Sequence, residues 1–357
     1  MRRRLLLLVV LAVASPPTHA ISYYFCPDVP TNDPSGATAT VFLPWQIVRN
    51  DSGTYTLRAS LPPSTPIDAL HQMCSGNWLI SVEAPTNLGG TDFEPRDVIR
   101  YDPASGTYAL FFGGAGAGVP SGANLDAAFL NGGDSAPLIL SFDVPVTIGA
   151  ATYDPADLVR YSGGTFSLFF DASAATPPVP TAYDVTGADR RASRTILSFD
   201  VPTTLGAATY LPGELVSWNG TSFASYDADP NWPVTSRLDA MSFLADPGSV
   251  GKIRVDKSML LPGGLRIGWS AATSAGADDY GIYEGRIGAW YSHTAIDCSD
   301  AAGDRAEDVT PGAGNRYYLV VPWNANDEGS YGQDSGGIER PVGVPATCRP
   351  TQSLECP

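Results

Sequence analysis

The sequence predicts an all-β protein, built from an array of repeated antiparallel strands followed by a smaller β-domain. A proline-centred motif recurs through the first two thirds of the chain. Short runs rich in β-branched and aromatic residues, bounded by Gly, Pro, Asn and Asp, are typical of consecutive hairpins. No segment has the sustained 3.6-residue periodicity of a helix. From about Gly251 a different pattern of strand-like runs begins.

Residues 1–20 have the composition of a bacterial export signal. A basic start (MRRR) precedes a short apolar run (LLLLVVLAVA) and a stretch ending in small residues (SPPTHA), which places the cleavage site after Ala20. The apolar run is shorter than the roughly 20 residues needed to cross a bilayer. No cysteine stands at the cleavage site to carry a lipid. We therefore expect export through the general secretion route, to the extracellular space, the periplasm or the cell surface.

The charge of the exported chain is strongly negative. Removing the three arginines of the signal leaves 18 of the 21 basic side chains against 37 acidic ones, a net charge of −19. Nucleic-acid binding requires a basic surface, so the composition argues against it. Anionic membrane surfaces are disfavoured for the same reason, and no later segment is apolar enough to predict a membrane span.

Four copies of the proline-centred motif define the repeat. Their prolines, at positions 44, 95, 155 and 212, are 51, 60 and 57 residues apart. A period of this length with several strands per unit is typical of propellers and related arrays. The copies are FLPWQIVRN from Phe42, FEPRDVIRY from Phe93, YDPADLVRY from Tyr153 and YLPGELVSW from Tyr210.

Three further runs complete each unit, giving the four strands of one propeller blade. One is an alternating run such as GTYALFFG from Gly106, and another is typified by LILSFDVP from Leu138. The third comprises PIDALHQM from Pro66, NLDAAFLN from Asn124, AYDVTGAD from Ala182 and RLDAMSFL from Arg237.

The array, residues 21–250, starts and stops midway through a unit, near Val41 and near Leu244. KIRV from Lys252 is a candidate for the missing last strand. Joining the two part-units into one blade would give about four blades and bury strand edges that an open array exposes. A curved open array of the same strands is the alternative.

Residues 251–345 contain strand-like runs that suit a small Greek-key sandwich. They include LRIGWSA from Leu265, DYGIYEG from Asp279 and RYYLVVPWN from Arg316, and Trp269 is the expected core tryptophan. With the following NANDEGSYG, this order resembles a fibronectin type III domain. The whole chain resembles secreted bacterial proteins that join propeller-type SFD, DLVRY and FSLFFD repeats to such a domain, and the resemblance implies no defined activity. Residues 346–357 form a tail.

The mature chain has five cysteines, and export permits disulfides. The simplest pairing follows the domain boundaries and joins Cys26 to Cys74 and Cys298 to Cys348. Cys356 is then left over, and it either replaces Cys348 as a partner or stays free. No pair has the CxxC spacing of a zinc or redox site.

No catalytic residue is predicted. The mature chain has only two histidines, His71 and His293, and neither lies in a motif that would activate Ser335 of the QDSGG string. No nucleophile elbow, metalloprotease helix or phosphate-binding loop occurs.

Repeated acids are candidates for binding calcium or a sugar. Glu94 and Asp97 recur as Asp154 and Asp157 in the next unit. The alternative is that they accept backbone N–H groups in the turn before each strand, and repetition in every unit favours that structural role. The acidic loop 297–308 is a second candidate for weak calcium binding, although it lacks the ligand spacing of an EF-hand.

Four aromatic residues fit no repeat or core position and are candidate ligand contacts: Trp232, Trp290, Tyr291 and Trp323. The leading interpretation is an exported non-catalytic binding or scaffold protein that contacts polysaccharide or protein. One alternative is a propeller-type hydrolase of carbohydrates or lactones that uses carboxylates or calcium. Another is a structural component of the cell surface or matrix.

Overall fold

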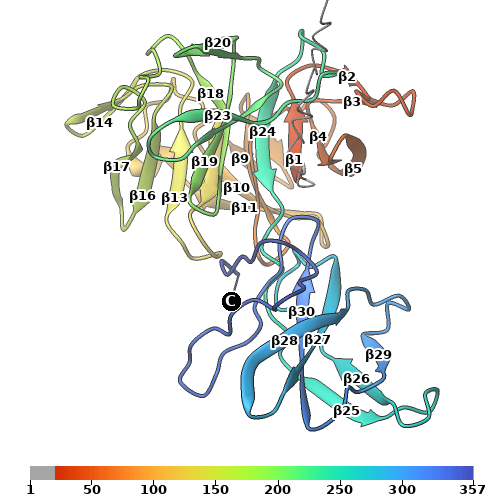
Figure 1. Ribbon diagram of the computed structural model, residues 1–357. Helices are drawn as coiled ribbons and strands as arrows, with labels where there is room; N and C mark the ends of the chain where they lie inside the picture. Colours follow the sequence, from red (N-terminus) through yellow and green to blue (C-terminus); the bar gives the residue numbers. More distant parts are fainter. Residues whose placement is uncertain (1–20, 357) are drawn as a thin grey trace, which may run out of the picture.

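The computed structural model describes residues 21–356 as a β-protein, with one short helix, α1 (Gly114–Ala117), among thirty strands. The predicted signal, residues 1–20, and the final residue lie outside the described part. A large propeller-like body and a smaller module are stacked one above the other (Figure 1).

Four antiparallel sheets of four strands form the larger body. In three of the sheets, the four strands follow one another in the chain: the last two runs of one repeat unit, then the proline-motif strand and the alternating run of the next unit. The remaining sheet joins β24, from the end of the array, to β1, β4 and β5. The sheets are β24 (Leu238–Phe243), β1 (Ser22–Pro27), β4 (Gln46–Asp51) and β5 (Thr54–Ser60); β6 (Ile67–Gln72), β7 (Trp78–Val82), β10 (Val98–Asp102) and β11 (Thr107–Phe112); β12 (Ala127–Leu130), β13 (Leu138–Ser141), β16 (Leu158–Ser162) and β17 (Thr165–Phe170); and β18 (Val185–Arg191), β19 (Arg194–Phe199), β22 (Leu215–Trp218) and β23 (Phe223–Asp227).

The four sheets close into a ring. The first strands, β6, β12, β18 and β24, contact their neighbours around the centre. Four apolar cores fill the spaces between adjacent sheets, and one of them, around Phe25, Trp232 and Phe243, lies between the last sheet and the first. Because every sheet is packed against two others, no sheet face is left at an open end of an array.

Closure of the ring depends on the N-terminal strand. β1 pairs with β4 of its own unit and with β24 of the last unit, where Tyr23 lies opposite Phe243. The prediction that KIRV supplies this strand is wrong, because β25 (Ile253–Lys257) pairs with β26 (Leu265–Trp269) in the smaller module. Every residue of β1 is buried and every residue of β25 is exposed, so only β1 suits the position between β24 and β4.

A short hairpin stands between the second and third strands of each sheet, and its last residue is the buried aromatic of the proline motif. The hairpins β14–β15 and β20–β21 lie at the end of the ring away from the smaller module (Figure 1). The four hairpins are β2 (Thr31–Asn32) with β3 (Val41–Phe42), β8 (Thr86–Leu88) with β9 (Thr91–Phe93), β14 (Val146–Ile148) with β15 (Ala151–Tyr153), and β20 (Thr203–Leu205) with β21 (Ala208–Tyr210).

The smaller body, called here the C-terminal module, has two three-stranded sheets and the segment that follows them to residue 356. One sheet has the order β25–β26–β29 (Ala306–Val309), and the other has the order β28 (Ala289–Asp297), β27 (Asp279–Arg286), β30 (Arg316–Trp323). Ile267, Trp269, Ile282 and Val320 pack together between them. Trp269 therefore lies in the core, where the sequence places it.

One of the two expected disulfides is wrong. Cys298 is bonded to Cys348, as expected, but Cys74 is bonded to Cys356, and Cys26 is a buried free thiol. Cys26 lies opposite Ala240, near the start of β24, whereas Cys74 follows the end of β6. The two residues therefore belong to different ends of the ring. Burial raises the pKa of the Cys26 thiol well above its usual value.

Candidate functional site

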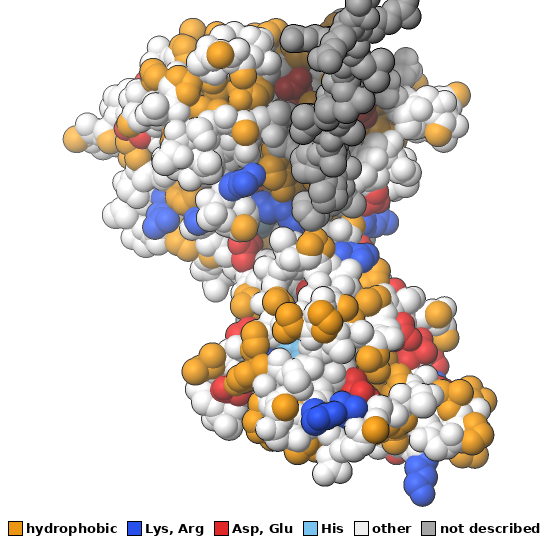
Figure 2. Space-filling view, viewed as in Figure 1, with side chains coloured by type: hydrophobic (Ala, Val, Ile, Leu, Met, Phe, Trp, Pro, Cys, Tyr) orange, Lys and Arg blue, Asp and Glu red, His pale blue; other side chains and the backbone are white. Residues whose placement is uncertain are grey.

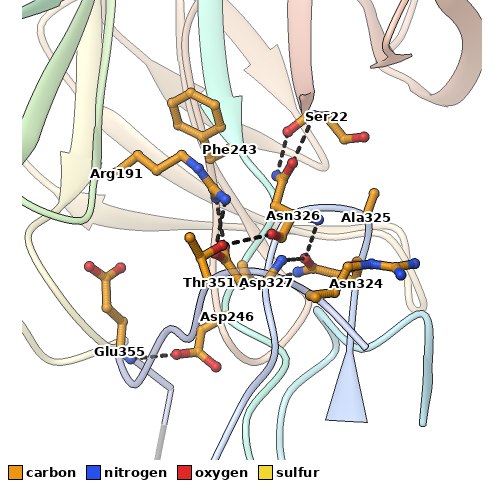
Figure 3. Close-up of polar contacts among 12 residues, drawn as sticks. Ser22, Arg191, Phe243, Asp246, Asn324, Ala325, Asn326, Asp327, Thr351 and Glu355 are labelled. Carbon is orange, nitrogen blue, oxygen red and sulfur yellow. Dashed lines mark hydrogen bonds and ion pairs between the residues drawn. The ribbon is translucent and has the colours of Figure 1, made fainter. Parts of the chain in front are cut away.

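The C-terminal module meets the ring at the end where the first strands finish. Arg191, the last residue of β18, donates two hydrogen bonds to the Asp327 carboxylate, at 2.6 and 2.9 Å. Figure 3 shows this pair beside Thr351, whose hydroxyl donates to the same carboxylate at 2.6 Å. Figure 2 shows basic side chains over the lower part of the ring, above the C-terminal module.

Buried amide contacts hold the same junction. Asn326 accepts the backbone N–H of Ser22 at 2.8 Å and donates to the Ser22 carbonyl at 2.7 Å (Figure 3). Asn324 donates to the carbonyl of Ala245 at 2.9 Å. A buried amide with its donors and acceptors both satisfied fixes the orientation of the two backbones that it joins. The junction is therefore a specific interface rather than a loose linker.

A cavity of about 190 Å³ lies at this junction, between the ends of β6 and β18 and the tail. His71, Gln72 and Arg190 line it from the ring, and Ser353 and Glu355 line it from the tail. We call it the junction cavity. The tail is tied to the ring by the Cys74–Cys356 disulfide and by a hydrogen bond of 2.5 Å from the Glu355 N–H to the Asp246 carboxylate.

Charged groups of both signs line the junction cavity: Arg190, Arg191, Asp246, Asp327 and Glu355. Removal from solvent, followed by the nearby carboxylates of Asp189 and Asp246, raises the pKa of Glu355 to about 7, while His71 and Arg190 act in the opposite direction. His71 Nδ1 lies 3.8 Å from an oxygen of the buried Asp189. This nitrogen is buried and has no hydrogen-bond partner within residues 21–356.

Four further aspartates lie near the opposite end of the ring, one at the start of each first strand: Asp68, Asp126, Asp184 and Asp239. We call them the inner aspartates. Burial is the largest cause of raised pKa values in all four, with the pKa of Asp68 at about 8 and that of Asp184 at about 6. A carboxyl group whose nearest partner is another carboxyl is held protonated in this way.

The inner aspartates are not equivalent, although the repeat would make them so. The carboxyl groups of Asp126 and Asp184 lie close enough for each to affect the pKa of the other. Asp68 interacts with Asp239 and accepts a hydrogen bond from the side-chain amide of Asn124. Among the inner aspartates, only Asp239 is paired with a basic side chain, since it accepts a hydrogen bond from Arg237 Nε at 2.8 Å.

Sequence analysis did not single out the inner aspartates. The signal is present, because an aspartate occupies the third position of each of the runs that begin at Pro66, Asn124, Ala182 and Arg237. Their pairing depends on ring closure, which brings strands from four units together.

The repeated acids proposed as metal ligands lie in the turns before the third strands. Asp97 accepts the backbone N–H groups of Glu94 and Gly114, both at 2.9 Å, so each of its oxygens has a partner. Asp157 makes the equivalent pair of contacts, with Asp154 and Ala172. Accepting backbone N–H groups in a turn is the structural role that was the alternative to calcium or sugar binding.

Some of the other carboxylates near these turns and in the acidic loop are also engaged within the protein. Glu94 accepts from Arg96 Nε at 2.6 Å. In the loop 297–308, Asp304 and Asp308 both accept from Arg266. Within residues 21–356, no three or more His, Cys, Asp or Glu side chains are grouped so that they could hold a metal ion.

Two of the four candidate aromatic contacts are covered. Trp232 is only 9% exposed, packs 5.2 Å from Phe25 and donates from Nε1 to the Ser236 carbonyl at 2.8 Å, so its assignment as a surface ligand contact is wrong. It fills the space where the last sheet meets the first. The Arg349 guanidinium covers the Trp323 ring at 3.7 Å from the ring centre, so that tryptophan anchors the tail.

The other two candidates are exposed on the sheet β28–β27–β30. Trp290 is 63% exposed and Tyr291 is 43% exposed. The Trp290 ring packs 5.5 Å from the ring of Tyr317, and the Tyr291 hydroxyl donates to Asp334 at 2.9 Å. We call Trp290, Tyr291 and Tyr317 the aromatic platform. It lies on a module whose visible face carries many hydrophobic side chains (Figure 2).

Two features hold the aromatic platform: His293 fixes Tyr317, and Tyr291 has an unusual backbone conformation. His293 bonds through Nδ1 to the Tyr317 hydroxyl at 3.1 Å and through Nε2 to the carbonyl of Pro341 at 2.8 Å, which fixes the Tyr317 ring. Tyr291 has a φ of 67°, in the left-handed region that bulky residues rarely adopt. Such a conformation costs of order 1–3 kcal/mol and is concentrated at functional sites.

No family model matches the chain, and no curated protein is significantly similar to it. Among solved structures, it is similar to the extracellular domain of the putative one component system BT4673 from B. thetaiotaomicron, with 7% identity and a TM-score of 0.25 over 84% of this chain and 41% of that one. It is also similar to virginiamycin B lyase from Staphylococcus aureus, with 10% identity and a TM-score of 0.26 over 66% and 73% of the two chains. The chain spans about two fifths of the BT4673 domain. These scores assign neither a fold nor an activity.

Within residues 21–356, no helix has the length and apolar character needed to cross a membrane.

Proposed function

We propose that this chain is an exported, non-catalytic binding protein whose C-terminal module contacts polysaccharide through the aromatic platform. The observation that carries the proposal is the exposure of two neighbouring aromatic residues on one sheet: Trp290, whose ring packs against Tyr317, and Tyr291, which has a positive φ. Exposed aromatic groups with polar tips suit ligands that have both apolar faces and hydroxyl groups. Asp334 adds a hydrogen-bonding group at the edge of the platform.

The proposed role of the rest of the chain is that of a scaffold. Two disulfides fit a protein that folds in an oxidising compartment, which agrees with the expected signal at residues 1–20. The strand orders β25–β26–β29 and β28–β27–β30 support a fibronectin type III-like sandwich over residues 251–345. The closed ring of four sheets supports a four-bladed propeller over residues 21–250.

A binding screen tests the proposal. The mature chain from Ile21 is titrated against soluble glycans and assayed for pull-down on insoluble polymers, with calcium and with a chelator. We expect saturable binding to at least one polysaccharide, weakened about tenfold or more by W290A, which corresponds to a loss of roughly 1.4 kcal/mol. The matched control is F111A, which removes a partly exposed aromatic residue of the ring.

Two results would overturn the polysaccharide assignment. One is the absence of saturable binding to every glycan and polymer under both conditions. The other is a binding curve that W290A and Y291A leave unchanged while both variants keep the circular dichroism spectrum of the parent.

The inner aspartates favour a second candidate function, that of a propeller-type hydrolase of carbohydrates or lactones. The specific observation is that Asp126 and Asp184 are interacting buried carboxyl groups whose pKa values are both raised, as a paired acid and base require. The test is an assay of glycan and lactone hydrolysis. If the candidate is correct, the parent protein turns over a substrate, and D126N and D184N abolish this turnover. The control D256N, in an exposed strand, should leave it unchanged. The hydrolase candidate is excluded if no turnover is detected, or if D126N leaves the turnover unchanged.

A further inference from the structure

An arginine recurs in the proline motif, and its partners differ from unit to unit. Arg49, Arg100 and Arg160 occupy the same position of the first three copies, and the fourth copy has Ser217 there. The Arg49 guanidinium donates two hydrogen bonds to the carboxylate of Asp278 in the C-terminal module, at 3.2 and 3.0 Å. The protein itself therefore shows that an arginine in this position can hold a carboxylate group.

Arg160 presents the same guanidinium group without a carboxylate. It is half-buried on β16, and within residues 21–356 none of its side-chain nitrogens forms a hydrogen bond or an ion pair. Its Nε atom is buried, so the two terminal nitrogens are the atoms that a ligand can reach. These two nitrogens form a planar fork that matches the two oxygens of a carboxylate.

Arg160 and Arg190 face the same gap between two sheets. Arg160 lies opposite Ile139, and Arg190 is two residues after Ala188 on β18, which places each pair on one face of its sheet. Ile139 and Ala188 belong to the single apolar core that fills this gap. Both guanidiniums lie over the ring of Phe169, at 5.5 and 5.9 Å from its centre. Two positive charges are therefore brought to one aromatic ring from neighbouring sheets.

No acid is ion-paired with either arginine in the described part of the chain. Arg190 donates from one terminal nitrogen to the Asn131 side chain at 2.9 Å and from Nε to the Ala192 carbonyl at 3.1 Å, and both acceptors are neutral. Glu355 lies within electrostatic reach of Arg190, but the two form no ion pair. Like charges held together repel each other, and a bound anion relieves that repulsion.

The neighbouring gap provides a contrast. Arg100 lies opposite Leu79, which belongs to the core shared with the sheet of β12, so Arg100 faces that sheet. By its place in the strand pairing, Leu130 is the residue of that sheet that corresponds to Arg190. An apolar residue thus takes the place of the second arginine, and Arg100 is a matched control for Arg160.

We propose that Arg160 and Arg190 form an anion site on the ring, which binds the carboxylate group of a ligand as Arg49 binds Asp278. Two sources supply such a group, a uronic acid unit of an acidic polysaccharide and a free organic acid. The net charge of the chain does not oppose this, because charges farther away than about 8 Å are largely screened at physiological ionic strength. The site is separate from the aromatic platform and does not depend on it.

Calorimetric titration of the mature protein tests the proposal, with trigalacturonate, its neutral methyl ester and citrate as probes. We expect saturable, salt-sensitive binding of at least one of the two acids. R160Q should weaken this binding at least tenfold, R190Q should weaken it severalfold, and R160K, which keeps the charge but loses the fork, should lie between R160Q and the parent. R100Q should change nothing. Binding of trigalacturonate alone identifies the polymer as the source of the carboxylate, and binding of citrate alone identifies a free acid.

The proposal is overturned if neither acid gives saturable binding, or if R160Q and R190Q bind the acids as well as the parent does. It is also overturned if R100Q weakens binding as much as R160Q, because the effect is then one of overall charge. Equal binding of trigalacturonate and its methyl ester would assign the contact to the sugar rings instead. Circular dichroism melts check that the variants are folded, and R190Q carries the test if R160Q is not.

Discussion

Arg191 and Asp327 form a two-pronged ion pair that joins the last residue of β18 to the loop after β30. Both side chains are largely buried, and the Thr351 hydroxyl adds a third hydrogen bond to the same carboxylate. A guanidinium and a carboxylate in this geometry fix direction as well as distance. The pair therefore sets the orientation of the C-terminal module on the ring.

Removing one partner of this pair should be costly. We predict that D327A lowers the free energy of unfolding by about 3 kcal/mol, because it leaves the Arg191 guanidinium buried without a counter-charge. Urea denaturation followed by tryptophan fluorescence measures the change. The exposed pair of Arg254 and Asp256 provides the control, since D256A should cost about 0–1 kcal/mol. Equal losses in the two variants would contradict a structural role for the junction pair.

The inner aspartates predict that stability falls as the pH rises from about 4 to 8. The folded-state pKa values of Asp68, about 8, and Asp184, about 6, lie above the roughly 3.9 of an unfolded aspartate. In this window the folded state binds more protons than the unfolded state, so each pH unit upward costs stability. Urea midpoints measured at pH 5 and pH 8 should therefore differ, with the higher midpoint at pH 5.

The variant D126N isolates this effect from other titrating groups, such as His293, whose lowered pKa acts in the opposite sense. In D126N the side-chain amide can donate a hydrogen bond to the Asp184 carboxylate at any pH, without a protonated carboxyl group at position 126. We predict that D126N is more stable than the parent at pH 8 and has a smaller difference between pH 5 and pH 8. A pH dependence that D126N leaves unaltered would show that the acid pair is not its source.

The thiols predict a specific labelling pattern. Cys26 is fully buried, and the other four cysteines are in disulfides, so a thiol reagent should not label the folded unreduced protein. After denaturation without reductant, the reagent should label one cysteine per molecule. Intact-mass analysis with peptide mapping should place that label on Cys26. A label on Cys356 instead would mean that the tail is not tied to the ring.

The tryptophans predict opposite results for two apparently similar substitutions. W232A removes a side chain from the core between the last sheet and the first, and should cost about 3–5 kcal/mol. W290A removes an exposed ring and should change stability by less than about 1 kcal/mol. Thermal melts of the two variants, compared with the parent, test both placements at once.

Much of the ring could be predicted from the sequence because each unit carries its own signals. The proline motif marks a buried aromatic residue and a turn in all four copies, and the runs around it become strands. β1 was missed because it stands alone before the first proline motif, with no complete unit to align it. The residue after it, Asp28, takes the position of Glu83, Asp143 and Asp200 in the other units, and that was the available clue.

The features that were missed depend on contacts between distant parts of the chain. The Cys74–Cys356 disulfide joins residues 282 positions apart, and only the packing of the tail against the ring brings them together. The same is true of the junction cavity, whose lining residues extend from His71 to Cys356 in the sequence. Exposure of Trp290 and burial of Trp232 likewise follow from the arrangement of sheets, since both residues occupy loop-like or strand-edge sequence with no periodic pattern.

The pairing of β1 with β24 sets an order on folding. β1 can pair with β4 early, but Tyr23 finds its second partner strand only when the chain has been completed as far as Phe243. Until then, the edges of β1 and of the last sheet are unpaired and open to other strands. Contacts this far apart in sequence form slowly. The polypeptide therefore spends its early life as an unclosed array, which is the period in which it is most vulnerable to aggregation and proteolysis.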